Sequence, residues 1–326
     1  MPLLLAAFSG YTRTNPPEKA PRPSRCNLPM RPAYAPHQEF LRPARPRSEL
    51  WRLGLGLLTA FAIFAALQWG LGALLIATLS PQTLMEVQAQ LALGNTPGGA
   101  TMMLASFGLI LVAVGLSVTH VHKRSALTLL GPKALLLPQF TRVLTALIAL
   151  NFAIWILPPS EFLHPIEANL PLATWLSFLP LAVPALLIQV SAEEILFRGY
   201  LQQQLAVRVK SPLVWMVLPS LGFGLLHLRP DLPETRWILV AWATLFGMLA
   251  ADLTARSGSL GPAIALHFVT NAMAILCVSS DDILSGLALG RMPVALGDPA
   301  QLTPYLLIDL GGMLCAWLAA RLALRC

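Results

Sequence analysis

The stretch of sequence that decides the fold is residues 53–79, LGLGLLTAFAIFAALQWGLGALLIATL, in which no side chain is charged. A run of about 20 apolar residues, wound as an α-helix, is long enough to cross the hydrocarbon core of a bilayer. Residues 101–119 form a second run without charged side chains. Two such runs in one chain predict helices that span a membrane.

The composition of the whole chain supports this prediction. Of its 326 residues, 56% are hydrophobic and 11% are charged, and the mean hydropathy is +0.67. An average soluble domain is about one quarter charged, so this chain has too few polar groups to cover the surface of a soluble protein. Its four cysteines have no paired spacing, which predicts free thiols. Ordinary soluble enzymes, disordered proteins and secreted disulfide scaffolds are therefore excluded.

Eight apolar segments follow the N-terminal region, and turn-forming residues such as Ser80-Pro81 and Ser257-Gly258 separate them. Their approximate bounds are 53–79, 101–121, 140–157, 172–196, 212–228, 237–255, 261–278 and 304–324. The sequence therefore predicts an all-α fold, a polytopic membrane bundle of about eight transmembrane helices.

The basic residues are distributed unequally between the two sides of such a bundle. If the N-terminus is cytoplasmic, 19 of the 22 Lys and Arg fall on the cytoplasmic side, and Arg229, Arg236 and Arg291 fall on the other. An excess of Lys and Arg marks cytoplasmic loops. An even number of spans then places both termini in the cytoplasm. The net charge of +7 is explained by the basic residues that flank the spans on the cytoplasmic side.

The chain is expected to consist of two parts. Residues 1–50 are rich in Pro and Arg and poor in apolar groups, a composition typical of disordered segments. We predict a disordered cytoplasmic tail over residues 1–50 and a membrane domain over residues 51–326. The lipid bilayer is an expected partner, and no nucleic acid is expected.

Polar residues inside the predicted spans are concentrated at SAEEILFRGY (191–200), FGLLHL (223–228) and ALHFVTN (265–271). Ionisable groups within a membrane are costly unless they are paired or face a cavity. Each of these groups is therefore a candidate functional residue. Taken alone, a Glu-Glu-Arg cluster can also be the interfacial end of a helix, and a lone histidine near a helix end is often interfacial.

Helical geometry separates the roles within two of these clusters. Glu194 and Arg198 are four residues apart, so they share a face and can pair as a structural support. Glu193 lies about 100° round the helix from Glu194 and remains available for chemistry. His267 and Asn271 also share one face of an otherwise apolar helix, and this face must point into the bundle.

The three clusters resemble, in order, the three signatures of the CAAX-protease and bacteriocin-processing (CPBP) family of intramembrane endopeptidases. The matching residues are Glu193-Glu194-x-x-x-Arg198, Phe223-x-x-x-His227 and His267-x-x-x-Asn271. The resemblance covers about residues 172–278, the expected catalytic core. It implies about eight helices, cytosolic termini and hydrolysis of a peptide bond in a membrane-anchored protein or peptide, such as a prenylated CAAX protein. We expect a location in a bacterial inner membrane.

The resemblance also supports a role for each polar side chain. Glu193 would act as the general base that activates water, and His227 would position this water or assist proton transfer. His267 and Asn271 would donate hydrogen bonds to the oxyanion.

A mechanism without a metal ion or other cofactor is favoured. Asn271 shares a face with His267, and an amide is a poor zinc ligand but a good oxyanion donor. The alternative is zinc held by Glu193, His227 and His267, because two histidines and one glutamate are a known catalytic set. The enzyme would then be a metallo-type rather than a glutamic-type endopeptidase.

Two other functional classes stay open. One is a non-catalytic immunity or scaffold protein of the same fold, which the intact Glu, His, His and Asn disfavour. The other is a proton-coupled transporter, for which intramembrane Glu and His are also typical. Transporters usually show internal repeats, and the first half of this chain has no counterpart of the polar clusters.

One expectation conflicts with the catalytic model. If the fourth span ends at residue 196, Glu193 lies near the cytoplasmic side, whereas His227 lies near the far end of its own span. About 15 residues of helix rise about 23 Å, which is too far for convergence. Either a break at Pro219, Gly222 or Gly224, or an inward course of residues 199–210, would bring them together.

Overall fold

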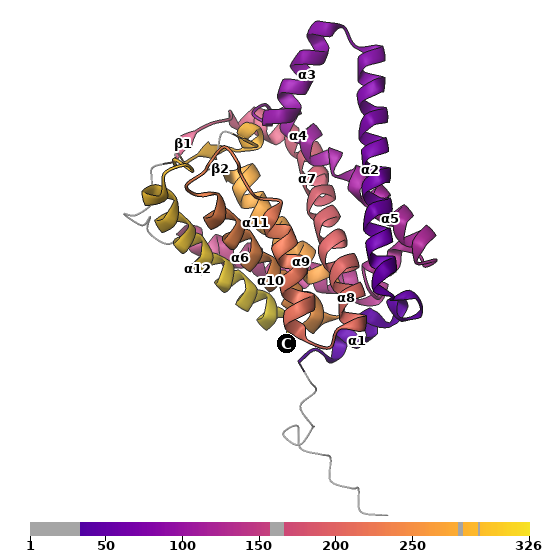
Figure 1. Cartoon of the computed structure of the whole chain (residues 1–326). Coiled ribbons are helices and arrows are strands. Elements are labelled where there is room, and N and C mark those ends of the chain that lie inside the picture. The colour runs from indigo at the N-terminus through magenta and orange to yellow at the C-terminus, as the bar shows by residue number, and fades with distance from the viewer. Residues whose placement is uncertain (1–32, 157–165, 280–282, 293) are drawn as a thin grey trace, which may run out of the picture. The chain divides into compact units, whose positions relative to one another are not determined.

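The computed structural model describes residues 33–156, 166–279, 283–292 and 294–326, and this part of the chain is almost entirely helical (Figure 1). The tail segment 1–32 lies outside the described residues. The elements in chain order are α1 (Ala35–Leu41), η2 (Arg42–Arg47), α2 (Leu50–Thr78), α3 (Pro81–Leu93), α4 (Pro97–Ser106), α5 (Gly108–Val121), η3 (Ala126–Leu129), α6 (Lys133–Ile156), β1 (Glu167–Ala168), α7 (Leu172–Glu194), η4 (Ile195–Gln202), α8 (Gln203–Arg208), α9 (Pro212–Leu225), α10 (Arg236–Ser257), α11 (Gly261–Ala272), η5 (Met273–Cys277), β2 (Val278–Ser279), η6 (Ser285–Leu287), β3 (Gly290–Arg291) and α12 (Pro299–Leu324).

The prediction of an all-α polytopic membrane bundle is confirmed. Within the described residues, six helical stretches are long and apolar enough to cross a membrane, and two shorter apolar helices accompany them. The six are Leu50–Thr78, Pro97–Val121, Lys133–Ile156, Leu172–Arg208, Arg236–Ser257 and Pro299–Leu324, and the two are Pro212–Leu225 and Gly261–Cys277. Each of the eight corresponds to one of the eight apolar segments predicted from the sequence.

Local signals explain where several of these helices begin and end. The Ser80 side chain accepts a hydrogen bond from the first turn of α3, and Gly94 closes this helix in the left-handed conformation at φ +59°. Thr96 caps α4 in the same way as Ser80 caps α3. These are the ordinary chemistries of a helix N-cap and of a glycine after a helix C-terminus.

Residues 35–47 of the predicted tail are folded rather than disordered. Residues 35–47 form α1 and η2, and Phe40, which is 1% exposed, packs in the main core. The Phe40 carbonyl oxygen accepts a hydrogen bond from Gln203 Nε2 at 2.6 Å. The expectation of disorder is therefore wrong for this stretch, because its few apolar side chains are buried against the membrane helices.

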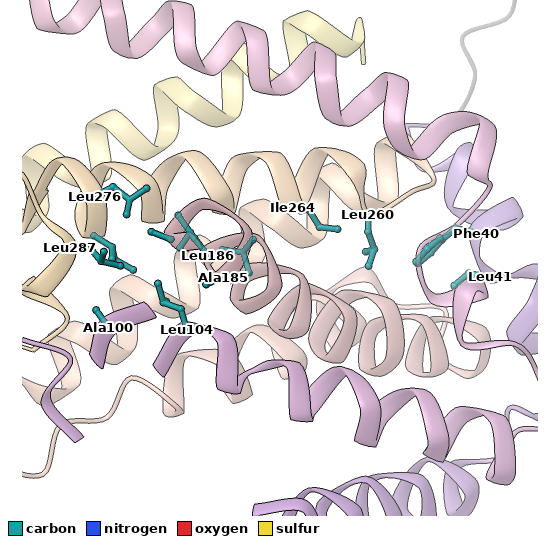
Figure 2. Packing of buried hydrophobic residues seen from close by; sticks show 13 residues of the cluster. Phe40, Leu41, Ala100, Leu104, Ala185, Leu186, Leu260, Ile264, Leu276 and Leu287 are labelled. Atoms are coloured by element: carbon teal, nitrogen blue, oxygen red, sulfur yellow. The ribbon is translucent and has the colours of Figure 1, made fainter. Parts of the chain in front are cut away.

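Figure 2 shows this core, which buried apolar side chains from widely separated parts of the chain form together. Phe40 of α1, Leu104 of α4 and Leu186 of α7 belong to it, together with Ile264 of α11. Residues distant in sequence thus pack α7 and α11, which carry the predicted site, into one layer.

The helix that carries Glu193 continues well beyond its predicted end. α7, η4 and α8 form one helical stretch from Leu172 to Arg208, and η4 in its middle is π-helical. Glu193 lies 15 residues before the end of this stretch, and His227 lies 15 residues after the start of α9 at Pro212. Since a short turn joins the two helices, Glu193 and His227 lie at a similar depth. The extension of the helix removes the conflict, and α9 has no break at Pro219.

α9 and α10 pack closely because glycines lie at their contact. A Cβ atom added at Gly224 would lie 2.6 Å from the Val240 carbonyl oxygen and would collide with Thr244 Oγ1. A Cβ atom at Gly247 would lie 2.9 Å from Ser220 Cβ. Small residues let membrane helices approach each other in this way.

Two tryptophan–aspartate hydrogen bonds join α10 to α12. Trp242 Nε1 donates to Asp309 at 2.8 Å, and Trp317 Nε1 donates to Asp252 at 3.0 Å. Asp252 also accepts from the Tyr34 hydroxyl at 2.8 Å, which ties the segment before α1 to the bundle. Asp309, an acidic residue within an apolar helix, is therefore hydrogen-bonded.

The short strands form a three-stranded sheet at the end of the bundle opposite α1 and α8 (Figure 1). β3 pairs antiparallel with β1 and parallel with β2. Asn169 Nδ2 donates to the carbonyl oxygens of Ser285 and Ala288 beside this sheet, at 2.9 and 2.8 Å. The sheet joins the start of α7 to the end of η5.

Candidate active site

The centre of the predicted site is a histidine between two glutamates. His267 Nδ1 lies 2.8 Å from Glu194 Oε1, and His267 Nε2 lies 3.4 Å from Glu193 Oε2. Because Glu194 Oε1 also accepts from Arg198, it acts as an acceptor here, and His267 Nδ1 donates to it. The other ring nitrogen of His267 is thereby directed at Glu193.

The Glu194–Arg198 pair predicted from the sequence is present and completely buried. Arg198 Nη1 donates to Glu194 Oε1 at 2.9 Å, and both residues are 0% exposed. The same Glu194 oxygen therefore accepts from both Arg198 and His267. This shared acceptor joins α11 to the helix that carries the glutamates. Removing a single charge from such a buried pair is costly, because the other charge is left without a partner.

Aromatic rings enclose the polar groups. The centroid of Phe246 lies 4.9 Å from that of His267, and the centroid of Phe223 lies 5.8 Å from it. The Arg198 guanidinium lies over the Phe223 ring at 4.7 Å, a cation–π geometry. Phe246 and Phe223 are each 2% exposed. These rings hold the imidazole plane and exclude lipid from the ion pair.

His227 does not join this hydrogen-bonded group. Its Nδ1 lies 3.0 Å from the Phe223 carbonyl oxygen, its ring contacts the Phe223 ring at 4.8 Å, and its side chain is exposed. Between His227 and either glutamate, all of them described residues, there is no hydrogen bond or ion pair. The Phe223 ring contacts both histidine rings and thus lies between His227 and His267.

Asn271 lies one helical turn from His267, and it contacts a residue that the sequence analysis missed. Asn271 Nδ2 donates to Gln189 Oε1 at 3.0 Å, and Gln189 is 6% exposed. Gln189 lies four residues before Glu193 on α7, so both share one helical face. The sequence did contain this signal, because Gln189 is a polar residue in an apolar stretch, four positions from a candidate base.

The site residues that the structure describes are not arranged as a metal centre. Among the described residues, no three His, Cys, Asp or Glu side chains are grouped so that they could hold a metal ion. The zinc set considered from the sequence, Glu193, His227 and His267, is not brought together. His267 instead directs both of its ring nitrogens at glutamates, so these residues as arranged do not fit a three-ligand centre.

Some buried atoms of the site have no hydrogen-bond partner among the described residues. They are Glu193 Oε2, Glu194 Oε2 and Arg198 Nη2. Buried polar atoms of proteins are usually satisfied, and the exceptions are concentrated at functional sites. Chemically, the site offers a carboxylate whose Oε2 makes no hydrogen bond, an imidazole nitrogen 3.4 Å from this oxygen, and an amide donor one turn away.

Comparison with known proteins agrees with the position of this site. Residues 174–273 match the family model described as type II CAAX prenyl endopeptidase Rce1-like, and every site residue predicted from the sequence lies within the match. The chain is also 25% identical over 193 residues to the uncharacterized protein YyaK of Bacillus subtilis (strain 168). That alignment covers 57% of this chain and 63% of YyaK, so less than two thirds of the relative is spanned. No solved structure matches the chain. The family resemblance inferred from the three motifs is confirmed for this part of the chain.

Proposed function

We propose that this membrane protein is an intramembrane endopeptidase that hydrolyses a peptide bond in a membrane-associated protein or peptide. One observation carries the proposal: the carboxylate of Glu193 is buried inside an apolar bundle, 8% exposed, and lies opposite His267 Nε2. Purely structural carboxylates in a membrane bundle pair with cations, as Glu194 does with Arg198. Glu193 has no arginine or lysine partner among the described residues, and its Oε2 lies 3.4 Å from His267 Nε2 without forming a hydrogen bond.

In the proposed mechanism, Glu193 removes a proton from a water molecule as the water attacks the scissile carbonyl carbon. The carbonyl oxygen becomes an oxyanion, to which Asn271 Nδ2 donates a hydrogen bond. His267 Nδ1–H is held by Glu194, so His267 Nε2 donates a second hydrogen bond only when the ring carries a proton on both nitrogens. Glu193 then delivers its proton to the leaving amine as the C–N bond breaks. Glu194 accepts from His267 Nδ1 and so directs Nε2 at Glu193, and Arg198 holds Glu194 in place through their ion pair.

The substrate class follows from where the site lies. Glu193 and His267 are surrounded by membrane helices and aromatic rings, so a substrate must enter from the bilayer or from its interface. A peptide carrying a lipid or an apolar segment satisfies this condition. The family model names CAAX prenyl endopeptidases, which makes a prenylated C-terminal peptide the first substrate to test.

The test uses purified full-length protein in detergent and an internally quenched peptide that ends in a farnesylated CAAX sequence. We expect cleavage by the parent and at least about 10³-fold slower cleavage by Glu193→Gln, because the amide has the same size but cannot accept the proton. Phe61→Ala on the lipid-exposed α2 is the matched control and should cleave at the parental rate. Chelation should leave the parental rate unchanged; stoichiometric metal and activity restored by zinc would contradict the metal-free mechanism.

A second readout covers the case in which the farnesylated peptide is not the substrate. Membrane peptides from cells expressing the parent are compared with those from cells expressing Glu193→Gln. A peptide cleaved only in the presence of the parent identifies the substrate. If neither the probe nor any membrane peptide differs between the two, the endopeptidase proposal is wrong and the non-catalytic alternative holds.

We also propose that both termini lie in the cytoplasm of a bacterial cell, on the basis of the 19 to 3 distribution of Lys and Arg. With the native cysteines replaced, a cysteine at position 125 should react with a thiol reagent restricted to the cytoplasm. A cysteine at position 234 should react only with an external reagent. Reversed labelling would overturn this orientation and leave the catalytic proposal intact.

A further inference from the structure

Two polar contacts join α7 to α11 in the site, one turn apart. Gln189 accepts from Asn271 at 3.0 Å, and Glu193 faces His267 at 3.4 Å. On each helix the two residues are four positions apart, and their order is opposite on the two helices. α7 and α11 are therefore antiparallel here, and each proposed oxyanion donor of α11 faces one polar residue of α7.

The Asn271 contact determines which end of an amide faces the site. The terminal torsion of an asparagine side chain is broad, so the chain itself does not choose between presenting Nδ2–H₂ or the carbonyl oxygen. In the structure Gln189 presents its carbonyl oxygen to Asn271, and the end of Asn271 that faces it is therefore the donating Nδ2–H₂. Gln189 is 6% exposed, so water competes little for this bond. One N–H of the Asn271 amide is held by Gln189, and the second stays available to a ligand.

We propose that Gln189 is a positioning residue for hydrolysis, which acts by holding the Asn271 amide with its N–H₂ turned toward the side of α7 that carries Glu193. This inference rests on the proposed function, because it requires Asn271 to donate to the oxyanion. Gln189 itself does not touch the reacting atoms. Its loss would release the donor without removing it, so the defect appears in turnover rather than in substrate binding.

The experiment is a double-mutant cycle measured as kcat and KM on the farnesylated probe, or on the membrane peptide that the Glu193→Gln comparison identifies. We expect Asn271→Ala to lower kcat about 100-fold, as removal of one oxyanion donor does. Gln189→Leu, which removes the acceptor at similar size, should lower kcat about 10-fold with KM within about twofold. The double variant should be no slower than Asn271→Ala alone, because Gln189 acts only through Asn271.

Two further variants distinguish positioning from structural support. Gln189→Glu keeps an acceptor oxygen for Asn271 and should restore most of the kcat that Gln189→Leu loses. Gln202→Leu is the matched control, since Gln202 is also a buried glutamine on this helical stretch but donates to the Ala251 carbonyl oxygen. It should lower the thermal stability and leave kcat per folded molecule unchanged. If Gln189→Leu cannot be purified, Gln189→Met takes its place in the cycle.

The outcomes separate the two proposals. If the effects of Gln189→Leu and Asn271→Ala multiply, or if Gln189→Leu changes only stability or KM, the positioning role is wrong. If Gln189→Leu matches the parent while Asn271→Ala and Glu193→Gln are slow, the positioning role fails and the proposed function stands. If Asn271→Ala and Glu193→Gln cleave at the parental rate, the site assignment itself fails.

Discussion

α2 and α10 are both apolar helices long enough to cross a membrane, yet they meet different surroundings. In the most apolar stretch of α10, 56% of the residues are buried in the protein, against 6% for α2. Phe246 of α10 is 2% exposed, whereas Phe61 and Trp69 of α2 are 71% and 79% exposed. Apolarity therefore accounts for insertion into lipid and not for packing within the protein.

What distinguishes the two helices is the partner that each face meets. Gly247 of α10 lies against Ser220 and Arg198, while a Cβ atom added at Gly54, Gly70 or Gly72 of α2 would meet no atom within 4 Å. A glycine thus marks a close contact only where another helix approaches. Within the spans, the polar and charged residues of the predicted site lie on the helices that pack inside the protein, because lipid offers them no partner.

The largest effect is expected for Glu194→Gln. This change leaves Arg198 buried without its counterion and weakens the contact with His267 Nδ1, which should cost about 3–5 kcal/mol of folding free energy. The measurement is the yield of monodisperse protein and its apparent Tm in detergent. The matched substitution of an exposed residue on α2, Trp69→Ala, should leave both values within error.

The double variant Glu194→Gln with Arg198→Met sharpens this prediction. Removing both charges leaves no unpaired ion, so a large part of the lost Tm should return while activity stays low. A Glu194→Gln protein as stable as the parent would show that the buried pair does not support the packed region.

A smaller effect on folding stability is expected from the titration of His37, at the contact between α1 and Trp215 of α9. His37 is 2% exposed and its ring lies 4.7 Å from that of Trp215, and this burial lowers the pKa of His37 to about 4. The unfolded state binds this proton near pH 6.5 and the folded state only near pH 4. Stability contributed by neutral His37 is therefore complete above pH 6.5 and falls by about 3 kcal/mol as the pH is lowered to about 4.

The check is the apparent Tm between pH 7.5 and pH 4 for the parent and for His37→Phe. As the pH falls, the Tm of the parent should fall more than the Tm of His37→Phe, because the phenyl ring has no proton to bind. Parallel curves over this whole range would contradict the predicted titration.

The smallest effects come from two matched glycine substitutions. Gly224→Ala should destabilise by about 1–3 kcal/mol, because its methyl group meets Val240 and Thr244 across the α9–α10 contact. Gly70→Ala on α2 should stabilise by about 0.5–1 kcal/mol, because alanine favours a helix where space is open. The changes in apparent Tm relative to the parent should have opposite signs, a decrease for Gly224→Ala and an increase for Gly70→Ala. Equal shifts would mean that the two helices are packed alike.

Much of the fold was readable from the sequence. The long apolar segments predicted each of the eight apolar helices, and the spacing of four residues predicted the Glu194–Arg198 pair and the shared face of His267 and Asn271. These predictions succeeded because helix formation and contacts within one helix depend on residues that are close in the chain. The extension of the Glu193 helix to Arg208 was missed, since Arg198 and Gly199 interrupt its apolar run and its last turns are polar.

The sequence by itself thus determined that the chain is a helical membrane protein and which polar side chains lie inside it, because the cost of placing charge and backbone in lipid acts locally. Only the tertiary structure decided which of these side chains meet. It placed His267 between Glu193 and Glu194, gave Asn271 the partner Gln189, and set His227 apart behind Phe223. Such contacts depend on how α7, α9, α10 and α11 pack against one another, and packing is a property of surfaces that lie far apart in the chain.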